Sequence, residues 1–548
     1  MPVSTTAPPS PPGRRTVAAV MAALLLGLLL SALDQMIVAA VMRTVADQLH
    51  GLTLQAWATT AYLATGVVST PLYGRLSDLY GRKPLYLVSI SLFLLGSALC
   101  AAAQSMYQLA AFRAVQGLGA GGLMALAFAI LADMLPPERR SRHQAWFGAA
   151  FGVASVAGPV LGGLFAGLDR LGGVAGWRWA FLVNLPIGAV ALFLVATLYR
   201  LPHTRVPHRV DYGGALTLLL GLAPLLVVAE QGGHWGWASA RTLALAGLGA
   251  AGLAAFVLTE RRMGDAALLP PAMFRRPLFA VSNAVNTVVG MGVFGGLSVL
   301  PMYLQIVKGL SPGAAGLMLL PQTLGIIAGG RLCGPVVTRT GRHKGFLLLG
   351  LACMTGCALA FSRLSPGTSL WTTGTVTTLM GLGIGVCFQV MLLAIQASAP
   401  PGAMGAASAS YTFFRQIGGT AGTAVYLSVL FALTGDRVAG ALHDAERTPE
   451  FGAALRDPAV ADTPAARRLL SALRDGTAPD LDDSSFLDRL DPRLARPVLE
   501  GLSGAMDSVF LIVTGVLAAG LVLALFLKDT GKDAGKDTDR KDRKEKTA

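Results

Sequence analysis

The stretch Gly74–Lys83, with the sequence GRLSDLYGRK, has a counterpart at Gly334–Lys344, with the sequence GPVVTRTGRHK. Glycine, arginine and lysine recur at the same or nearly the same offsets in the two stretches, and Thr338 stands in the place of Asp78. Each stretch directly follows a long apolar run. The repeat predicts a chain built from two equivalent halves.

The composition of the 548 residues points to a membrane protein. Of these residues, 53% are hydrophobic and only 14% are charged, and 66 are glycine. Soluble domains carry about 25% charged residues and about 7% glycine. Several soluble domains of this total length would need more polar surface than the chain has. A cytosolic enzyme, a secreted disulfide scaffold and a collagen-like chain are therefore excluded.

Fourteen apolar runs, each close to the roughly 20 residues that a spanning helix needs, follow one another along the chain. They lie at 17–41, 55–73, 85–103, 107–132, 144–168, 179–199, 212–230, 241–259, 278–300, 312–332, 345–362, 370–396, 404–433 and 506–527. The two copies of the repeat occupy equivalent positions if spans 7 and 8 are an insert. The sequence thus predicts an all-α polytopic membrane protein with two six-helix bundles and two inserted central spans.

The net charge of +14 is concentrated in short basic clusters and in the C-terminal tail. The clusters recur in every second loop, at 82–83, 139–142, 261–262, 275–276 and 342–344. This spacing is typical of the positive-inside rule and not of a phosphate-binding stripe. Six tryptophans, including Trp177, gather at the opposite ends of the spans, as an interfacial belt would. We therefore expect a multi-pass protein of the cell membrane with both termini in the cytoplasm and no nucleic-acid partner.

These patterns divide the chain into seven parts. They are a cytoplasmic N-terminal tail (1–16), an N-terminal six-helix bundle (17–200), two inserted spans with linkers (201–277), spans 9–13 of the C-terminal bundle (278–433), an extracytoplasmic loop (434–505), span 14 (506–527) and a basic cytoplasmic tail (528–548). In the loop, Pro464–Arg474 and Phe486–Leu499 have helical apolar spacing. An amphipathic lid and a solvated spacer explain this loop equally well.

Reactive side chains give no sign of an enzyme. The five cysteines lie in apolar or small-residue surroundings without a CxxC pair, and the seven histidines fall in or beside loops. We find no nucleophile–base pair and no metal-ligand spacing. We therefore expect no catalytic residues, no metal and no cofactor.

Five motifs follow one another at matching spans. They are LDQMIV at 33–38, GRLSDLYGRK at 74–83, RAVQGLG at 113–119, GVASVAGPVLGG at 152–163 and WRWAFLVNLPIG at 177–188. With them the chain resembles, over nearly its whole length, the fourteen-span drug:proton antiporters of the major facilitator superfamily, which are multidrug efflux transporters. The resemblance implies the major facilitator fold.

Asp34 is the one acidic residue deep within an apolar run of the first half. A charge at the bilayer centre costs roughly 2.5–3.5 kcal/mol on insertion scales, and removal from water favours the protonated form of a carboxyl group. Asp34 is therefore a candidate for proton exchange or for contact with a cationic substrate. A structural ion pair or an interfacial cap is the alternative.

Two arginines within the spans are equally costly. By resemblance, Arg113 is tied to proton transfer, and it would act on a nearby carboxyl group because arginine hardly deprotonates. Gln116 lies on the same helix face, and Arg415 is the analogue of Arg113 in span 13. Structural arginines that bind carbonyl groups are the alternative.

The loop after span 2 permits a tight turn at Gly74 and Gly81. By resemblance, this loop latches the cytoplasmic side in the outward-open state, with Asp78, Arg82 and Lys83 as its charges, and Asp133 at the end of span 4 is a further candidate member. Plain anchoring by the two basic residues is the alternative.

In span 5, the resemblance implies antiport through the glycine motif, whose members are Gly152, Gly158, Pro159, Gly162 and Gly163. Small residues also permit bending and close helix packing, which explains the glycine-rich string at 117–122 better than a dinucleotide site does.

The resemblance implies a proton-coupled antiporter that exports amphiphilic drugs or toxic small molecules by alternating access, with the proton gradient as its energy source. Its partners would be the small-molecule substrate, protons and the lipid bilayer, and the chain would work as a monomer. Export of an endogenous metabolite, a lipid or a siderophore is the alternative.

Overall fold

The computed structural model describes residues 14–49, 55–199, 211–310, 312–340, 342–400, 403–474 and 489–527. Thirteen helices in these ranges are long and apolar enough to cross a membrane. The helix α2 (Gln55–Tyr80) has the length but is not among the thirteen, because hydroxyl side chains lower its hydropathy. With α2, the helices match the fourteen predicted spans in order. The prediction of an all-α polytopic membrane protein is confirmed.

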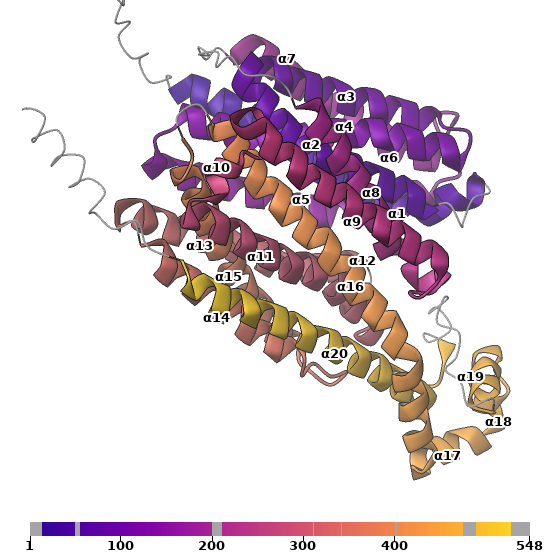
Figure 1. Cartoon of the computed structure of the whole chain (residues 1–548). Helices are drawn as coiled ribbons and strands as arrows, with labels where there is room; N and C mark the ends of the chain where they lie inside the picture. The colour runs from indigo at the N-terminus through magenta and orange to yellow at the C-terminus, as the bar shows by residue number, and fades with distance from the viewer. Residues whose placement is uncertain are drawn as a thin grey trace, which may run out of the picture.

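The first half of the chain forms one bundle, drawn in indigo and purple in Figure 1. Its helices are α1 (Arg14–Gln48), α2, α3 (Arg82–Ala102), α4 (Met106–Met134), α5 (Pro137–Gly167), α6 (Trp179–Leu182) and α7 (Asn184–Leu198). The hairpin of β1 (Arg170–Leu171) and β2 (Val174–Ala175) joins α5 to α6. Span 6 is predicted as continuous, but the structure divides it at Val183, so that Asn184 begins a new helix.

The second half forms the other bundle, drawn in red to yellow in Figure 1. Its helices are α11 (Pro277–Met302, continued by a π turn Tyr303–Val307), α12 (Pro312–Leu317), α13 (Leu320–Thr340), α14 (His343–Phe361), α15 (Leu370–Ala397), α16 (Met404–Glu446) and α20 (Pro492–Leu525). Between the halves, α8 (Tyr212–Trp235) and α9 (Ala240–Met263) pack as a pair, followed by the short α10 (Pro271–Phe274).

Glycines allow equivalent helices of the two halves to touch in the same way. A Cβ atom at Gly121 of α4 would lie 2.3 Å from the carbonyl oxygen of Gly66 in α2. A Cβ atom at Gly385 of α15 would lie 2.1 Å from the carbonyl oxygen of Ile326 in α13. The pairs α2–α4 and α13–α15 thus correspond, as the sequence repeat predicts for spans 2 and 10. The glycine-rich string of α4 serves helix packing.

The segment after span 13 differs from the prediction. The helix α16 does not end at residue 433 but continues to Glu446, and its 43 residues are about 65 Å long, twice the thickness of a bilayer core. The helix α20 likewise begins at Pro492. The two extensions pack closely at Gly501 and Val438. They carry the short helices α17 (Pro449–Arg456), α18 (Pro458–Ala461) and α19 (Pro464–Arg474), at the lower right of Figure 1.

Contacts between the bundles include the end of α2 and the start of α16, beside the loop that carries Arg82 and Lys83. We call this side of the protein the basic side. There α16 packs against α2 and α4, and α13 packs against α5. Gln389 of α15 donates a hydrogen bond to Gln144 of α5 over 2.8 Å. The rings of Phe128 in α4 and Tyr411 in α16 meet edge to face, 5.6 Å apart. The two halves are therefore in contact on this side.

Candidate functional site

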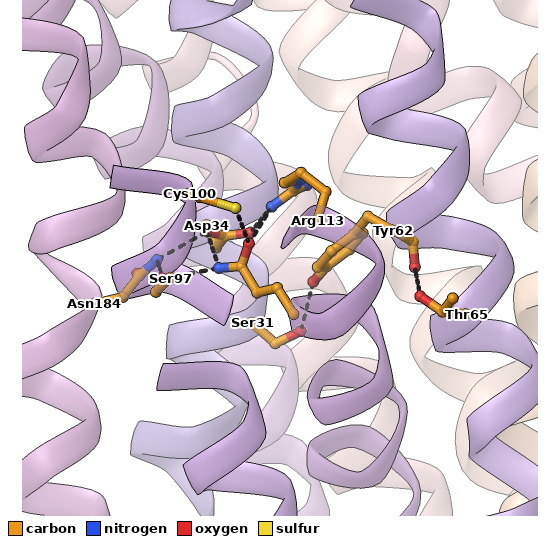
Figure 2. A network of polar contacts seen from close by, with 9 residues as sticks. Ser31, Asp34, Tyr62, Thr65, Ser97, Cys100, Arg113 and Asn184 are labelled. Atoms are coloured by element: carbon orange, nitrogen blue, oxygen red, sulfur yellow. Dashed lines mark hydrogen bonds and ion pairs between the residues drawn. The ribbon is translucent and has the colours of Figure 1, made fainter. Parts of the chain in front are cut away.

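A buried polar network surrounds Asp34 in the middle of α1 (Figure 2). Arg113 Nη1 of α4 lies 2.6 Å from Asp34 Oδ2 and forms an ion pair with it. Gln116 Nε2, one helical turn further along α4, donates to Asp34 Oδ1 over 2.8 Å. Asn184 Nδ2 of α7 donates to the same oxygen over 2.8 Å. The side chain of Asp34 is fully buried, so both of its oxygens are bound by protein groups.

A second layer of contacts holds the donors in place. Ser97 Oγ of α3 accepts hydrogen bonds from both Gln116 and Asn184, each over 2.8 Å. The guanidinium of Arg113 lies 3.9 Å from the ring centroid of Tyr62 in α2. Five helices of the N-terminal bundle therefore meet at one carboxylate.

The sequence predicts three members of this network, namely Asp34, Arg113 and Gln116. It misses Asn184, Ser97 and Tyr62, which carry no charge and resemble ordinary polar residues of a membrane helix. The signal for Asn184 was its place in the motif at 177–188. The motif does not show that the helix breaks at Val183 and begins again at Asn184.

The charge of Asp34 is balanced inside the protein by a cation from another helix. In the unprotonated form, the charge of Asp34 is balanced by Arg113 and its oxygens accept three hydrogen bonds. Protonation would remove the charge that holds Arg113 and would turn an acceptor into a donor. A buried cation left without its partner is strongly destabilised.

A second cluster lies on the basic side, where Asp78 at the end of α2 meets the start of α16. Asp78 accepts hydrogen bonds over 3.0 Å from the backbone amides of Gly405 and Ala406. These amides belong to the first turn of α16, where free donors and the helix dipole favour an anion. Asp78 therefore joins the N-terminal bundle to the C-terminal bundle.

The ion pairs of Arg82 extend this cluster. Arg82 lies 2.6 Å from Asp78 and 2.7 Å from Asp133 of α4. Gly81, with a φ of 100°, provides the turn that brings Arg82 back to α2. A Cβ atom at Gly74 would lie 2.3 Å from the Cβ atom of Ala409 in α16.

Lys83 lies apart from this cluster. Its Nζ donates to the carbonyl oxygen of Ala196 in α7 over 2.7 Å, at an exposed position within its own bundle. The geometry groups Gly74, Asp78, Arg82 and Asp133 at the contact between the bundles and leaves Lys83 outside it.

The glycines of α5 have different surroundings. A Cβ atom at Gly152 would lie 2.0 Å from Thr323 Cγ2 of α13, across the contact between the bundles. Gly158 and Gly162 face α1, where a Cβ atom would lie 2.2 Å from that of Met36 and 2.6 Å from that of Ala40, respectively. Pro159 stands between them, within the helix.

Gly163 is the exception, because a Cβ atom there would meet nothing within 4 Å. Close packing explains the other three glycines of the motif and not this one.

Arg415 of α16 is buried in a different setting from Arg113. Its guanidinium lies 5.0 Å from the ring centroid of Phe388 and 5.3 Å from that of Tyr411. Within the described ranges it forms no ion pair or hydrogen bond, and it has no bond to the Asp34 network. Aromatic faces partly offset the loss of hydration of such a cation.

Among the described residues, no group of three His, Cys, Asp or Glu side chains is placed to hold a metal ion. The structure instead brings together two sets of polar groups. One is the ion pair of Asp34 and Arg113 between helices of the N-terminal bundle. The other is Asp78 at the start of α16, at the contact between the bundles.

Comparison with known proteins agrees with the fold. The model of the Major Facilitator Superfamily matches residues 24–423. The chain is 34% identical to an uncharacterized MFS-type transporter of Mycobacterium tuberculosis, over 94% of this chain and 70% of the relative. It is 32% identical to multidrug resistance protein 3 of Bacillus subtilis, over 93% of this chain and 94% of the relative.

A tetracycline resistance determinant of Streptomyces rimosus is 40% identical over 60% of this chain and 94% of the relative. Among solved structures, the human organic anion transporter MFSD10 (TETRAN) superposes with a TM-score of 0.55 at 18% identity, over 93% of this chain and all of that one. At this identity the structural likeness supports the fold alone. Together with the motifs and the buried network, these matches place the chain in the major facilitator superfamily of membrane transporters, within the drug efflux family that its sequence resembles.

Proposed function

We propose that the protein exports amphiphilic drugs or other toxic small molecules across the cell membrane in exchange for protons. The observation that carries this proposal is the fully buried Asp34 carboxylate with its Arg113 partner. Relatives with the names multidrug resistance protein and tetracycline resistance determinant support the substrate class. The proton gradient would supply the energy, so no cofactor is needed.

In the proposed cycle, the basic side faces the cytoplasm and carries both termini. The contacts of Asp78 with α16 and of Gln144 with Gln389 close that side while the substrate leaves outward. A proton from outside then binds Asp34 and frees Arg113, which favours the inward-open arrangement. There the proton leaves and a new substrate enters, from the cytoplasm or the inner leaflet. One monomer contains all the groups of this cycle.

Substrate-dependent proton movement in liposomes tests the proposal. The full chain would be reconstituted with a pH-sensitive dye inside, and a tetracycline or a fluorescent cationic dye would be applied as substrate. We expect substrate movement in one direction to drive proton movement in the other. Asp34→Asn should lose this coupling.

The control is Asp169→Asn, which removes an exposed carboxylate in the loop between α5 and α6. It should behave like the unmodified protein. Normal coupled export by Asp34→Asn would overturn the assignment of Asp34, and substrate export without any proton movement would overturn antiport.

A further inference from the structure

A cavity of about 1210 Å³ lies beside the inserted pair of helices, where α8, α9 and α10 meet α2 and α16. Its walls are mainly apolar, and they include Leu222 of α8, Phe256 of α9 and Phe414 of α16. The Asp34 network does not line it. The cavity is therefore a second site, separate from the proposed proton site.

Two arginines form the polar end of this cavity. Arg261 lies in the last turn of α9 and Arg275 directly follows α10, and both are exposed on the basic side. Within the described residues, neither guanidinium has an ion pair or a hydrogen bond. Glu260 also lines the cavity, but its Oε2 accepts a hydrogen bond from the amide of Leu269 over 2.7 Å and pairs with neither arginine.

An apolar cavity with unpaired cations at one end has the chemistry of a phospholipid site. Arginine binds phosphate through two parallel N–H donors, and basic pockets between spanning helices on the cytoplasmic side bind anionic head groups. We propose that this cavity binds one anionic phospholipid of the leaflet at the basic side. Its phosphate would lie between Arg261 and Arg275, and an acyl chain would lie against Leu222 and Phe256.

The position of the cavity would bring the lipid into contact with both bundles and with the inserted pair of helices. Val67 of the N-terminal bundle and Phe413 of the C-terminal bundle both line it, together with the inserted pair. One lipid would therefore contact three parts of the protein that must shift against each other when the bundles move. The inserted helices thus have a role as one wall of a lipid site.

Native mass spectrometry of the full chain in detergent tests this proposal. Phosphatidylglycerol and phosphatidylcholine with identical acyl chains would be titrated separately. We expect one phosphatidylglycerol to bind about tenfold more tightly than phosphatidylcholine. The double variant Arg261→Gln/Arg275→Gln should lose this preference. Arg262→Gln should keep it, because Arg262 is exposed beside Arg261 but does not line the cavity.

The apolar part of the site has its own variant. Ala229→Trp places a large side chain in the cavity wall and should weaken the binding of both lipids, while the protein still elutes as a folded monomer. Equal affinity for the two lipids, or an unchanged preference in the double arginine variant, would overturn the proposal. The proposal would also be overturned if a transported dye displaced phosphatidylglycerol equally well from the unmodified and the double-variant protein. The occupant of the cavity would then be the transported substrate.

Discussion

Asn184 Nδ2 donates a hydrogen bond to Asp34 Oδ1 over 2.8 Å, although 150 residues separate the two in the chain. Asn184→Leu would remove this bond and the one to Ser97. A hydrogen bond to a charged group contributes about 1.5–3 kcal/mol, so we expect export to fall by about tenfold or more. Initial rates of dye export from cells with matched protein levels would measure the effect.

Thr197→Val is the control on the same helix. Thr197 is exposed and its hydroxyl donates to the carbonyl oxygen of Phe193 in its own helix. The substitution should leave export unchanged. If Asn184→Leu exports as fast as Thr197→Val, the contact with Asp34 has no part in transport.

A second prediction concerns the contact between Asp78 and the start of α16. Asp78→Asn removes the charge that faces the amides of Gly405 and Ala406 and leaves Asp133 as the carboxylate paired with Arg82 among the described residues. We expect the population to shift toward states that are open on the basic side. Spin-label distances between α2 and α16 on that side should lengthen.

Lys83→Gln is the matched control for this charge change. Lys83 lies in the same loop motif but binds Ala196 within its own bundle. The spin-label distances between α2 and α16 in Lys83→Gln should equal those of the unmodified protein. A shift of equal size in both variants would mean that the loop acts through net charge and not through the helix start.

The fold was predictable because its signals are repetitive. Long apolar runs, basic clusters in every second loop and the repeated stretch at 74–83 and 334–344 each depend on many residues. The exceptions are local. Trp177 was expected in the interfacial belt, but it is buried and its Nε1 donates to Gln48 Oε1 over 2.9 Å. A pattern of positions along the chain does not distinguish a tryptophan that faces lipid from one that faces another helix.

The site was predictable where it carries charge, and at Gln116, which lies on the same helix face as Arg113. Asp34 and Arg113 were found because a membrane span normally excludes charged residues. Asn184 and Ser97 cost little in a span, so they gave no such signal. The length of α16 was missed for a similar reason, since Asp436 and Arg437 end the apolar run after residue 433, whereas the helix continues by packing against α20. Tertiary contacts, which the sequence does not display, decide these features.

A third prediction uses two glycines of α5 that differ in their surroundings. Gly152→Ala would place a Cβ atom 2.0 Å from Thr323 Cγ2, so α5 and α13 could not approach each other as they do here. We expect a large loss of export because the closed arrangement of the basic side becomes inaccessible. Gly163→Ala, on the same helix with open space around it, should export normally.

A compensating change makes this test specific. Thr323→Ala removes the two side-chain atoms nearest to the methyl group that Gly152→Ala introduces. The double variant should therefore recover part of the lost export. Loss of export in Gly163→Ala, or no recovery in the double variant, would show that the motif requires glycine for helix flexibility and not for the contact.

The last prediction compares the two buried arginines by thermal unfolding in detergent. Arg113→Gln leaves the Asp34 carboxylate buried without a cation, and breaking a buried pair in this way costs about 3–5 kcal/mol. Arg415→Gln instead removes a buried cation that has only the faces of Phe388 and Tyr411 as partners among the described residues. The cation–π contacts of Arg415 contribute about 0.5–2 kcal/mol to stability. Their loss is offset because the variant no longer buries an unpaired charge.

We therefore expect a clear fall of the unfolding temperature for Arg113→Gln and little change for Arg415→Gln. The double variant Asp34→Asn/Arg113→Gln should recover stability relative to Arg113→Gln alone, because it removes both charges of the pair. Equal destabilisation by the two single variants would mean that Arg415 has a counter-charge in the folded protein. Arg415 would then not be an unpaired cation beside Phe388 and Tyr411.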